Sequence, residues 1–345
     1  MGVTSQHKST ANGALVITGD VSECGCANQD HGKSSTSTYD PLAPTIFHEE
    51  WWLNAATGGT FEVAEVTAGG RTLGRFPFYI RKRLGLRLMH MPELTYFLGP
   101  AIAEGEGSPS NRFLKRLEIT RELIDKLPAV SSRYVKCHTG ITDAIAFQER
   151  SFRAYVQFTH EISPRPVETL WQEMRDKTRN VVRRAREQLF IRELADPAEF
   201  FELFERNLAL ENLRNGLDTG LCQNIIGVAL DRQRGRILAA YDKNKRMVAA
   251  NVCVWDETRS YYLLSTRCSD SGNGASSLLI WEALQESARR GLMFDFAGLG
   301  ARGSILLYTG FGGVVSPRYV AVHMNPFARI AIGAKSLFVR ENFFY

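Results

Sequence analysis

Short apolar runs and one long amphipathic stretch alternate between residues 237 and 322. Two apolar runs separated by a charged turn predict a β-hairpin, and a third run predicts a strand beside it. A glycine-rich loop then opens a helix. The predicted elements are strands at 237–241, 247–255 and 259–265, a helix from 274 to about 290, a strand at 294–296, a helix at 304–308 and a strand at 318–322. This order predicts a mixed sheet with a helix that starts near its middle.

The first half of the chain repeats this order of helix, hairpin, strand, helix and strand. Gly69 and Gly70 mark the hairpin turn, and Ser110 is the predicted N-cap of the long helix. The predicted elements are a helix at 46–55, strands at 61–66 and 73–80, a helix at 110–126, and strands at 134–137 and 154–159. We therefore predict an α/β fold of mixed sheets, in which two similar subdomains are joined side by side.

Between these subdomains the spacing of apolar residues predicts one long helix, 167–189, followed by a second helix at 197–210. A second face of the long helix carries four arginines. Because few acidic residues interleave with them, this face could bind phosphate through the guanidinium groups, or it could simply be a solvated helix face. The four are Arg175, Arg179, Arg183 and Arg186, of which we select Arg179 and Arg183 as candidate substrate-binding residues.

Length and composition set the domain plan. A chain of 345 residues with 44% hydrophobic residues is long enough for about two domains with substantial cores. We predict a disordered tail at 1–40, a degenerate first subdomain at 41–165, a second subdomain at 166–325 and a helical tail at 326–345. The chain contains no apolar run long enough for a membrane span and no secretory signal, so we expect a cytoplasmic protein.

The cysteines and the distribution of charge indicate which metals and ligands the protein could bind. The six cysteines are scattered and are expected to be reduced thiols. Cys24 and Cys26 with His31 lack a second matching pair, so we expect no metal site. The net charge is +5, and basic residues gather at 71–87 and at 175–192. Such surfaces attract phosphates, nucleotides or RNA.

The loop before the predicted helix at 274 is a candidate anion site. Its glycines let backbone amides converge where the helix presents unpaired N–H groups and the positive end of its dipole, although glycine and serine also simply begin helices. Arg267, a few residues upstream, could add a charge or could be an ordinary exposed arginine. The candidate donor-binding residues are Arg267, Gly272, Asn273, Gly274 and Ala275.

Two candidate catalytic residues follow in the second subdomain. Asp295 alternates with Phe294 and Phe296 on a predicted strand, so it points to the opposite face. It could act as a general base or could cap backbone amides. Tyr308 could protonate a leaving thiolate, or its ring could pack on the sheet. The sequence contains no Walker loop, dinucleotide fingerprint or nucleophile elbow.

These segments together resemble the FemAB-like branch of the GNAT acyltransferase fold, which includes the cellulose-biosynthesis-associated (CelD-like) acetyltransferase domains. The resemblance extends over roughly residues 162–323, and the first half agrees only in element order. The matching segments are Trp171-x-x-Met174-x-x-Lys177-x-Arg179-Asn180-x-x-Arg183-Arg184-Ala185, Gly272-Asn273-Gly274-Ala275-x-x-Leu278-Leu279-Ile280-Trp281, Phe294-Asp295-Phe296-Ala297-Gly298 and Tyr308-Thr309-Gly310-Phe311-Gly312-Gly313.

The resemblance implies an N-acyltransferase that moves an acyl or aminoacyl group to an amine by direct attack. Acyl-CoA is the expected cosubstrate, with no permanently bound cofactor, and the amine belongs to an amino sugar, an amino acid or a peptide. The branch that uses aminoacyl-tRNA commonly has a lysine in a position that looks like Thr309 here. Because this chain lacks that lysine, aminoacyl-tRNA is the second candidate donor, after acyl-CoA. A non-catalytic binding module in a polysaccharide or lipid pathway is a third reading. The apolar and basic C-terminal tail could contact a membrane surface peripherally or pack on the protein itself.

Overall fold

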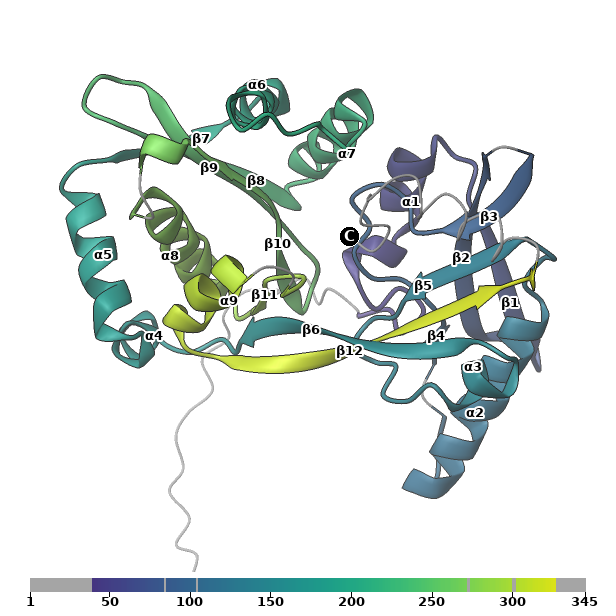
Figure 1. Cartoon of the computed structure of the whole chain (residues 1–345). Coiled ribbons are helices and arrows are strands. Elements are labelled where there is room, and N and C mark those ends of the chain that lie inside the picture. Colours follow the sequence, from purple (N-terminus) through teal and green to yellow (C-terminus); the bar gives the residue numbers. More distant parts are fainter. Residues whose placement is uncertain (1–38, 84, 104, 272–273, 300–301, 327–345) are drawn as a thin grey trace, which may run out of the picture. The chain divides into compact units, whose positions relative to one another are not determined.

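The computed structural model describes residues 39–326, except residues 84, 104, 272–273 and 300–301 (Figure 1). The predicted N-terminal tail, apart from its last two residues, lies outside the described residues. So do the C-terminal tail beyond residue 326 and the candidate residues Gly272 and Asn273.

The first half of the chain, up to residue 162, begins with a helical turn and continues with strands and helices. Its elements are η1 (Ile46–His48), α1 (Glu50–Thr57), β1 (Glu62–Ala68), β2 (Arg71–Arg83), β3 (Leu86–His90), β4 (Ala101–Ile102), α2 (Pro109–Asp125), β5 (Ser132–Lys136), α3 (Ile145–Glu149) and β6 (Arg153–Ile162).

The second half begins with four helices around one strand and ends with the unit that the sequence pattern outlined. Its elements are α4 (Val167–Glu173), α5 (Asp176–Arg186), β7 (Phe190–Leu194), α6 (Pro197–Leu210), α7 (Thr219–Asp231), β8 (Gly235–Tyr241), β9 (Met247–Trp255), β10 (Arg259–Arg267), η2 (Ser269–Ser271), α8 (Gly274–Arg289), β11 (Met293–Asp295), α9 (Arg302–Tyr308), η3 (Thr309–Phe311) and β12 (Val314–Met324).

One sheet connects the two halves through exchanged strands (Figure 1). The strand order is β1-β2-β3-β5-β12-β6-β11-β10-β9-β8-β7, with β4 paired to β2. Each half contains one parallel pair, β3 with β5 and β10 with β11. The last strand of each half then crosses over: β6 pairs with β11, and β12 pairs with β5. Because β6 and β12 also pair with each other, each half completes the sheet of the other.

Helices cover the sheet on different faces in the two halves. In the first half, α2 and α3 pack on the strands, and Phe76, Leu123 and Phe147 are buried between them. In the second half, α6 and α7 lie on one face of β8–β10, while α4, α5 and α8 lie on the other (Figure 1). The mixed sheet and the repeated order of elements that the sequence predicts are confirmed.

The long helix predicted at 167–189 is wrong in its extent, because α4 ends at Glu173 and α5 begins at Asp176. Met174 and Arg175 between them have extended backbone angles. The N–H of Arg175 donates to the carbonyl of Gly310 at 3.0 Å instead of continuing the helix. The apolar spacing carries across this break because Met174 is buried in the same core.

Two other details differ from the predictions. The N-cap of α2 is Ser108, whose hydroxyl accepts from the N–H of Asn111 at 3.3 Å, and not Ser110, which lies inside the helix. The sequence reading also missed α7, which Asp218 caps. Gly220 and Gly227 within α7 weaken the local helix signal, and the buried face of this helix is set by packing against α1 and α6.

Candidate functional site

A free strand edge is the central feature of the second half. The parallel strands β10 and β11 pair only from Arg259 to Tyr261. Beyond that point β10 continues to Arg267, whereas the chain after β11 turns to β6, where Phe296 donates its N–H to the carbonyl of His160. Among the described strands, none pairs with this outer stretch of β10 on its β11 side. Unpaired backbone groups on such an edge are where an extended ligand chain adds to a sheet.

The N-terminus of α8 follows directly from this strand. Gly274 opens the helix, and a Cβ added there would lie 3.4 Å from the Cβ of Ala185 in α5. Ala275 is fully buried, backbone included, so of these two residues only Gly274 is partly accessible. Arg267, at the end of β10, is exposed. The described part of the predicted donor site is therefore a set of backbone N–H groups beside one exposed arginine.

Asp295 lies at the centre of the sheet and is 0% exposed. Its Oδ1 accepts from the hydroxyl of Thr159 at 2.5 Å and from the N–H of Ala297 at 2.7 Å, and its Oδ2 accepts from Arg318 at 3.0 Å. Burial raises the pKa of Asp295, while Arg318 and the hydrogen bond from Thr159 oppose the shift. A carboxylate with its lone pairs occupied in this way has no free oxygen for a substrate proton, which favours a structural role.

Asp295 and Arg318 belong to a larger ion cluster that contains a second acidic residue and a second arginine. Glu161 on β6 accepts from both Arg259 on β10 and Arg318 on β12. Burial works against ionisation of Glu161, but a hydrogen bond from Ser316 and the two arginines hold its pKa below the usual value. Two carboxylates thus balance two guanidinium groups inside the sheet. The four residues come from β6, β10, β11 and β12, so this cluster fixes the strands where the two halves exchange.

Tyr308 lies at the end of α9, above the strand that carries Asp295. Its ring stacks on Phe296 with centroids 4.0 Å apart and meets Tyr262 edge-on. Burial raises the pKa of Tyr308, so the hydroxyl keeps its proton at neutral pH, and its hydrogen bond with Ser304 opposes this shift. The ring packs on the sheet as the conservative reading of the sequence expected. Tyr308 therefore packs against the core that contains Phe294 and Phe296, the neighbours of Asp295 in the chain. The carboxylate of Asp295 instead accepts hydrogen bonds from Thr159, Ala297 and Arg318.

The arginines of α5 make contacts within the protein. Arg179 donates to the carbonyl of Gln172 at 2.7 Å and pairs with Asp176, so it closes the C-terminal end of α4. Arg183 donates to Asn180 at 2.9 Å and lies over the ring of Trp171. These contacts connect α4 to α5 and use the donor groups that a phosphate would need. Substrate binding by Arg179 and Arg183 remains a prediction.

The glycine-rich turn after Tyr308 has a packing role that the sequence did not indicate. A Cβ on Gly310 would lie 2.4 Å from the hydroxyl of Thr178, and one on Gly313 would lie 2.3 Å from the carbonyl oxygen of Glu161. Gly313 also has a φ of +89°. The turn therefore needs glycine at these positions, because the start of α5 and strand β6 approach it closely. Two of the segments that carry the family resemblance are in direct contact here.

Lys136 on β5 is a functional candidate that sequence reasoning missed. Its ammonium lies 5.3 Å from the ring centre of Phe97 and 5.8 Å from that of Tyr96. Burial lowers the pKa of Lys136 to about 8, although Asp295 favours the charged form. The hydroxyl of Tyr96 donates to the carbonyl of Leu263 in β10 at 2.7 Å, so the first half contacts the free-edge strand directly. The available signal was a lysine at the end of β5 between two apolar residues, Val135 and Cys137.

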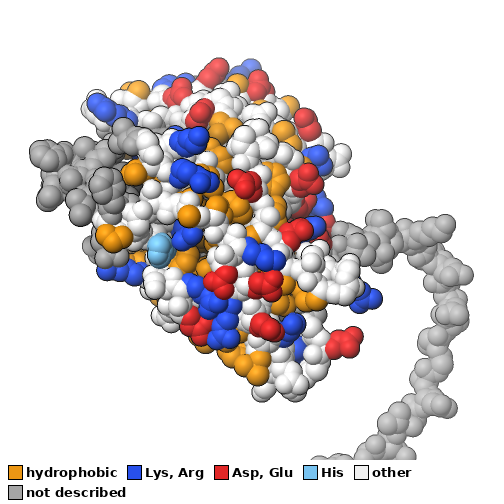
Figure 2. All heavy atoms as spheres, turned by 90° about the vertical axis from the view of Figure 1, so that its right-hand side faces the viewer, with side chains coloured by type: hydrophobic (Ala, Val, Ile, Leu, Met, Phe, Trp, Pro, Cys, Tyr) orange, Lys and Arg blue, Asp and Glu red, His pale blue; other side chains and the backbone are white. Residues whose placement is uncertain are grey.

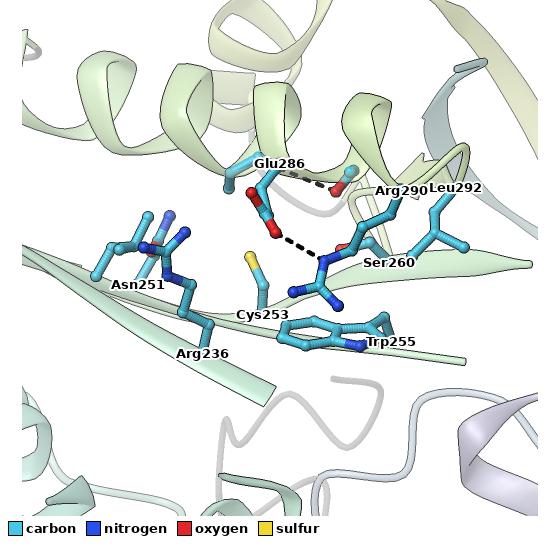
Figure 3. Close-up of a pocket in the computed structure, with 11 residues that line it drawn as sticks. Arg236, Asn251, Cys253, Trp255, Ser260, Glu286, Arg290 and Leu292 are labelled. Atoms are coloured by element: carbon cyan, nitrogen blue, oxygen red, sulfur yellow. Dashed lines mark hydrogen bonds and ion pairs between the residues drawn. The ribbon is translucent and has the colours of Figure 1, made fainter. Parts of the chain in front are cut away.

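A small pocket lies between α8 and strands β8–β10 (Figure 3). Glu286 accepts from Arg290 at 2.8 Å, and Arg290 lies over Trp255. The enclosed volume of about 10 Å³ has room for about one water molecule, so this pocket does not hold a substrate. Within the described residues, no cluster of His, Cys, Asp or Glu could hold a metal ion, and no helix could cross a membrane.

Comparison with known proteins identifies the second half. Residues 172–303 match the family model of the acetyltransferase (GNAT) domain. No curated protein matches this chain in sequence. The solved structure of FemX superposes with a TM-score of 0.59 at 11% identity, covering 84% of this chain and 93% of FemX. The C-terminal domain (DUF2156) of an Agrobacterium fabrum protein, provisionally named a lysylphosphatidylglycerol synthetase, gives a TM-score of 0.54 at 15% identity and covers 86% and 95% of the two chains.

At these identities the structural likeness concerns the fold. The CelD-like assignment stays a prediction, because the comparisons give no support for it. The matched range contains β10, α8 and β11, and thus both the free strand edge and the helix N-terminus. Residues 172–303 are therefore similar to the acetyltransferase (GNAT) domain, and the chain shares the fold of FemX.

Proposed function

We propose that this protein transfers an acyl group from acyl-CoA to an amine of an amino sugar, an amino acid or a peptide. The observation that carries the proposal is the free edge of β10 beside the N-terminus of α8. The extended arm of CoA would add to the strand edge by backbone hydrogen bonds, and its phosphates would bind the N–H groups in the first turn of α8. Acyl-CoA is a cytoplasmic compound, which agrees with the predicted location.

The transfer itself needs little from the protein beyond positioning. The amine nitrogen attacks the thioester carbonyl, a C–N bond forms, the C–S bond breaks, and the amine loses a proton while the thiolate gains one. Tyr308 is the proposed proton donor to the thiolate, because its ring stacks on Phe296 just after β11, the strand parallel to β10, and burial raises the pKa of its hydroxyl. Asp295 is assigned to positioning, through the ion cluster that fixes β11 against β6 and β12.

Ser276, in the first turn of α8, offers a sharp test of the donor site. Ser276→Asp places a negative charge where the helix dipole favours it, so the fold should keep its stability, but the charge would repel the donor phosphates. Acetyl-CoA should bind at least about tenfold more weakly to this variant, whereas Ser276→Asn should bind like the original protein. Calorimetric titration of both variants measures this. Equal affinity for the two would remove the start of α8 from the site.

A library of amines tested with acetyl-CoA and long-chain acyl-CoA would then identify the reaction. Free CoA, detected by a thiol reagent, should appear only when donor and amine are both present. If acyl-CoA raises the melting temperature but no amine releases CoA, the non-catalytic binding module is the better reading.

An aminoacyl-tRNA donor is the second candidate. The strands β2 and β3 present four exposed basic residues around their turn, and none of the four forms an ion pair with a described residue: Arg81, Lys82, Arg83 and Arg87. Figure 2 views this side of the molecule, where basic and acidic side chains are interspersed, so the surface is not uniformly basic. Binding of tRNA that weakens steeply with salt, and that is lost in a variant with Lys82 and Arg83 changed to Gln, would favour this donor over acyl-CoA.

A further inference from the structure

A cleft of about 350 Å³ lies in the first half of the chain, away from α8 and β10. Its walls are the first half of α2, the residues Pro100, Ile102, Ala103 and Gly105, the loop after β5, and the residues that precede η1. This volume falls within the range of small-molecule sites, which begins at about 300 Å³. The small pocket beside α8 is far below that range.

The lining of this cleft is divided into a basic side and an apolar side. Arg112, Lys115 and Arg116 come from α2, and the described lining residues include no aspartate or glutamate. The remaining lining is mainly apolar and rigid, with prolines on the rim. These residues include Pro41, Pro44, Ile102, Pro109, Phe113 and Ile141. The chemistry that fits is an anion that carries an apolar group.

The charges of α2 are arranged against its own dipole. No acidic residue lies in the first turn and no basic residue lies in the last turn of this helix, while the three cations of the cleft occupy its first half. The N-terminal end of a helix is positive and this effect falls off within the first turn, so among these cations only Arg112, the fourth residue of α2, is disfavoured, by roughly a few tenths of a kcal/mol, while an anion there is favoured. A bound anion would relieve this conflict. Such a local violation of a stability rule is typical of a functional site.

The three basic side chains differ in the contacts that they make within the protein. Arg116 lies over the ring of Phe113 and donates to Thr142 at 3.3 Å and Asp143 at 3.4 Å, which holds it in place. Lys115 pairs with Glu118 at 3.1 Å. Arg112 is exposed, and its side chain forms no ion pair or hydrogen bond with a described residue. Its guanidinium group can therefore turn to a ligand without breaking an internal contact.

The base of the cleft is a neutral histidine. His138 accepts from the N–H of Gly140 through Nδ1 at 3.1 Å, so its Nε2 carries the hydrogen and donates to the carbonyl of Pro100 at 2.9 Å. Burial lowers the pKa of His138 to about 4, which keeps the ring neutral. A Cβ on Gly140 would lie 2.6 Å from this ring, so the loop packs closely on it. The floor is thus a fixed, uncharged surface.

We propose that the cleft along the first half of α2 is a second ligand site, which binds a small organic anion with its charge at Arg112 and its apolar group against Ile102 and Ile141. The site is separate from the proposed donor site on α8 and stands independently of the reaction performed there. Phosphate monoesters and carboxylic acids that carry a small aromatic or branched alkyl group share the required chemistry.

Calorimetric titration of the full chain with phenyl phosphate tests this site. We expect phenyl phosphate to bind more tightly than inorganic phosphate or phenol alone, because each of these offers only half of the contacts. Arg112→Gln should weaken phenyl phosphate binding about tenfold, since it removes a charge-assisted hydrogen bond. Arg206→Gln, an exposed arginine on α6, is the matched control and should leave binding unchanged.

Three results would overturn the proposal. One is the absence of binding heat up to about 10 mM phenyl phosphate, a concentration that would reveal even weak complexes. Another is equal affinity in the original protein and in Arg112→Gln. The third is loss of phenyl phosphate binding in Ser276→Asp, which would place the ligand at α8 instead. Because Arg112 is exposed and its side chain bonds to no described residue, its replacement should not alter folding.

Discussion

Lys136 should make the stability of this protein depend on alkaline pH in an unusual direction. Burial lowers the pKa of its ammonium from 10.5 to about 8. The unfolded chain therefore keeps this proton up to about pH 10.5, while the folded protein releases it near pH 8. Between these values the unfolded state binds more protons, so the free energy of unfolding rises with pH. The difference between the two pKa values corresponds to about 3 kcal/mol. Below pH 8, where Lys136 is protonated in both states, the folded protein is destabilised by this full amount.

Buried thiols oppose this effect in the same pH range. Burial raises the pKa of Cys137 and of Cys253 to about 12, so the unfolded state loses these protons first and stability falls above about pH 9. The curve of the original protein alone would mix the two trends. Lys136→Met removes only the ammonium, and the difference between the two curves isolates its contribution.

Urea unfolding at several pH values between 7 and 10 provides the measurement. The free energy of unfolding of the original protein, minus that of Lys136→Met, should increase by about 2 to 3 kcal/mol over this range. Lys243→Met, at an exposed hairpin position, should give a curve parallel to the original. If the Lys136→Met curve is also parallel to the original, Lys136 is solvated in the folded protein and the reasoning from its burial fails.

Two further substitutions test the centre of the sheet and the glycine turn. Asp295→Asn keeps the side-chain shape but leaves Arg318 and Arg259 with one carboxylate, so the free energy of unfolding measured in urea should fall by about 3 kcal/mol. The control Asp270→Asn, on the surface, should change this free energy little. An unchanged urea midpoint in Asp295→Asn would show that the cluster is hydrated. Gly313→Ala should cost at least about 2 kcal/mol, because its φ is positive and its Cβ would contact the carbonyl of Glu161. Gly227→Ala, in open space on α7, should be neutral or stabilising, and a similar result for both glycines would contradict the close approach at the turn.

The second half was predictable because its strands are apolar and its turns are marked. The strand predicted at 247–255 has the same first and last residues as β9 (Met247–Trp255). The helix predicted from 274 to about 290 corresponds to α8. In these segments the local pattern and the final packing agree. The break between α4 and α5 could not be predicted, because its cause is a hydrogen bond from Arg175 to Gly310, far along the chain. No residue of the helix itself signals it.

The candidate site was predictable in its position and less so in its details. The helix start at Gly274 was predicted because the backbone freedom of glycine marks a loop before a helix in the local sequence alone. Asp295 was found as a polar residue between two phenylalanines, but its partners Thr159, Glu161 and Arg318 come from other strands. The exchange of β6 and β12 brings these strands together, and the spacing of residues within a strand carries no information about which strand will lie beside it.

This exchange also explains why the matched domain does not contain the whole site. Residues 172–303 include β10, β11 and α8, but β11 is held on its other side by β6, which belongs to the first half. The separation of β10 from β11 depends on that pairing, because the chain after Asp295 bonds to β6 and so leaves β10 unpaired. Tyr96 of the first half also binds the carbonyl of Leu263 in β10. The free edge that would receive the donor is therefore a product of both halves, and the first half, which lies outside the matched range, is part of the proposed transferase site.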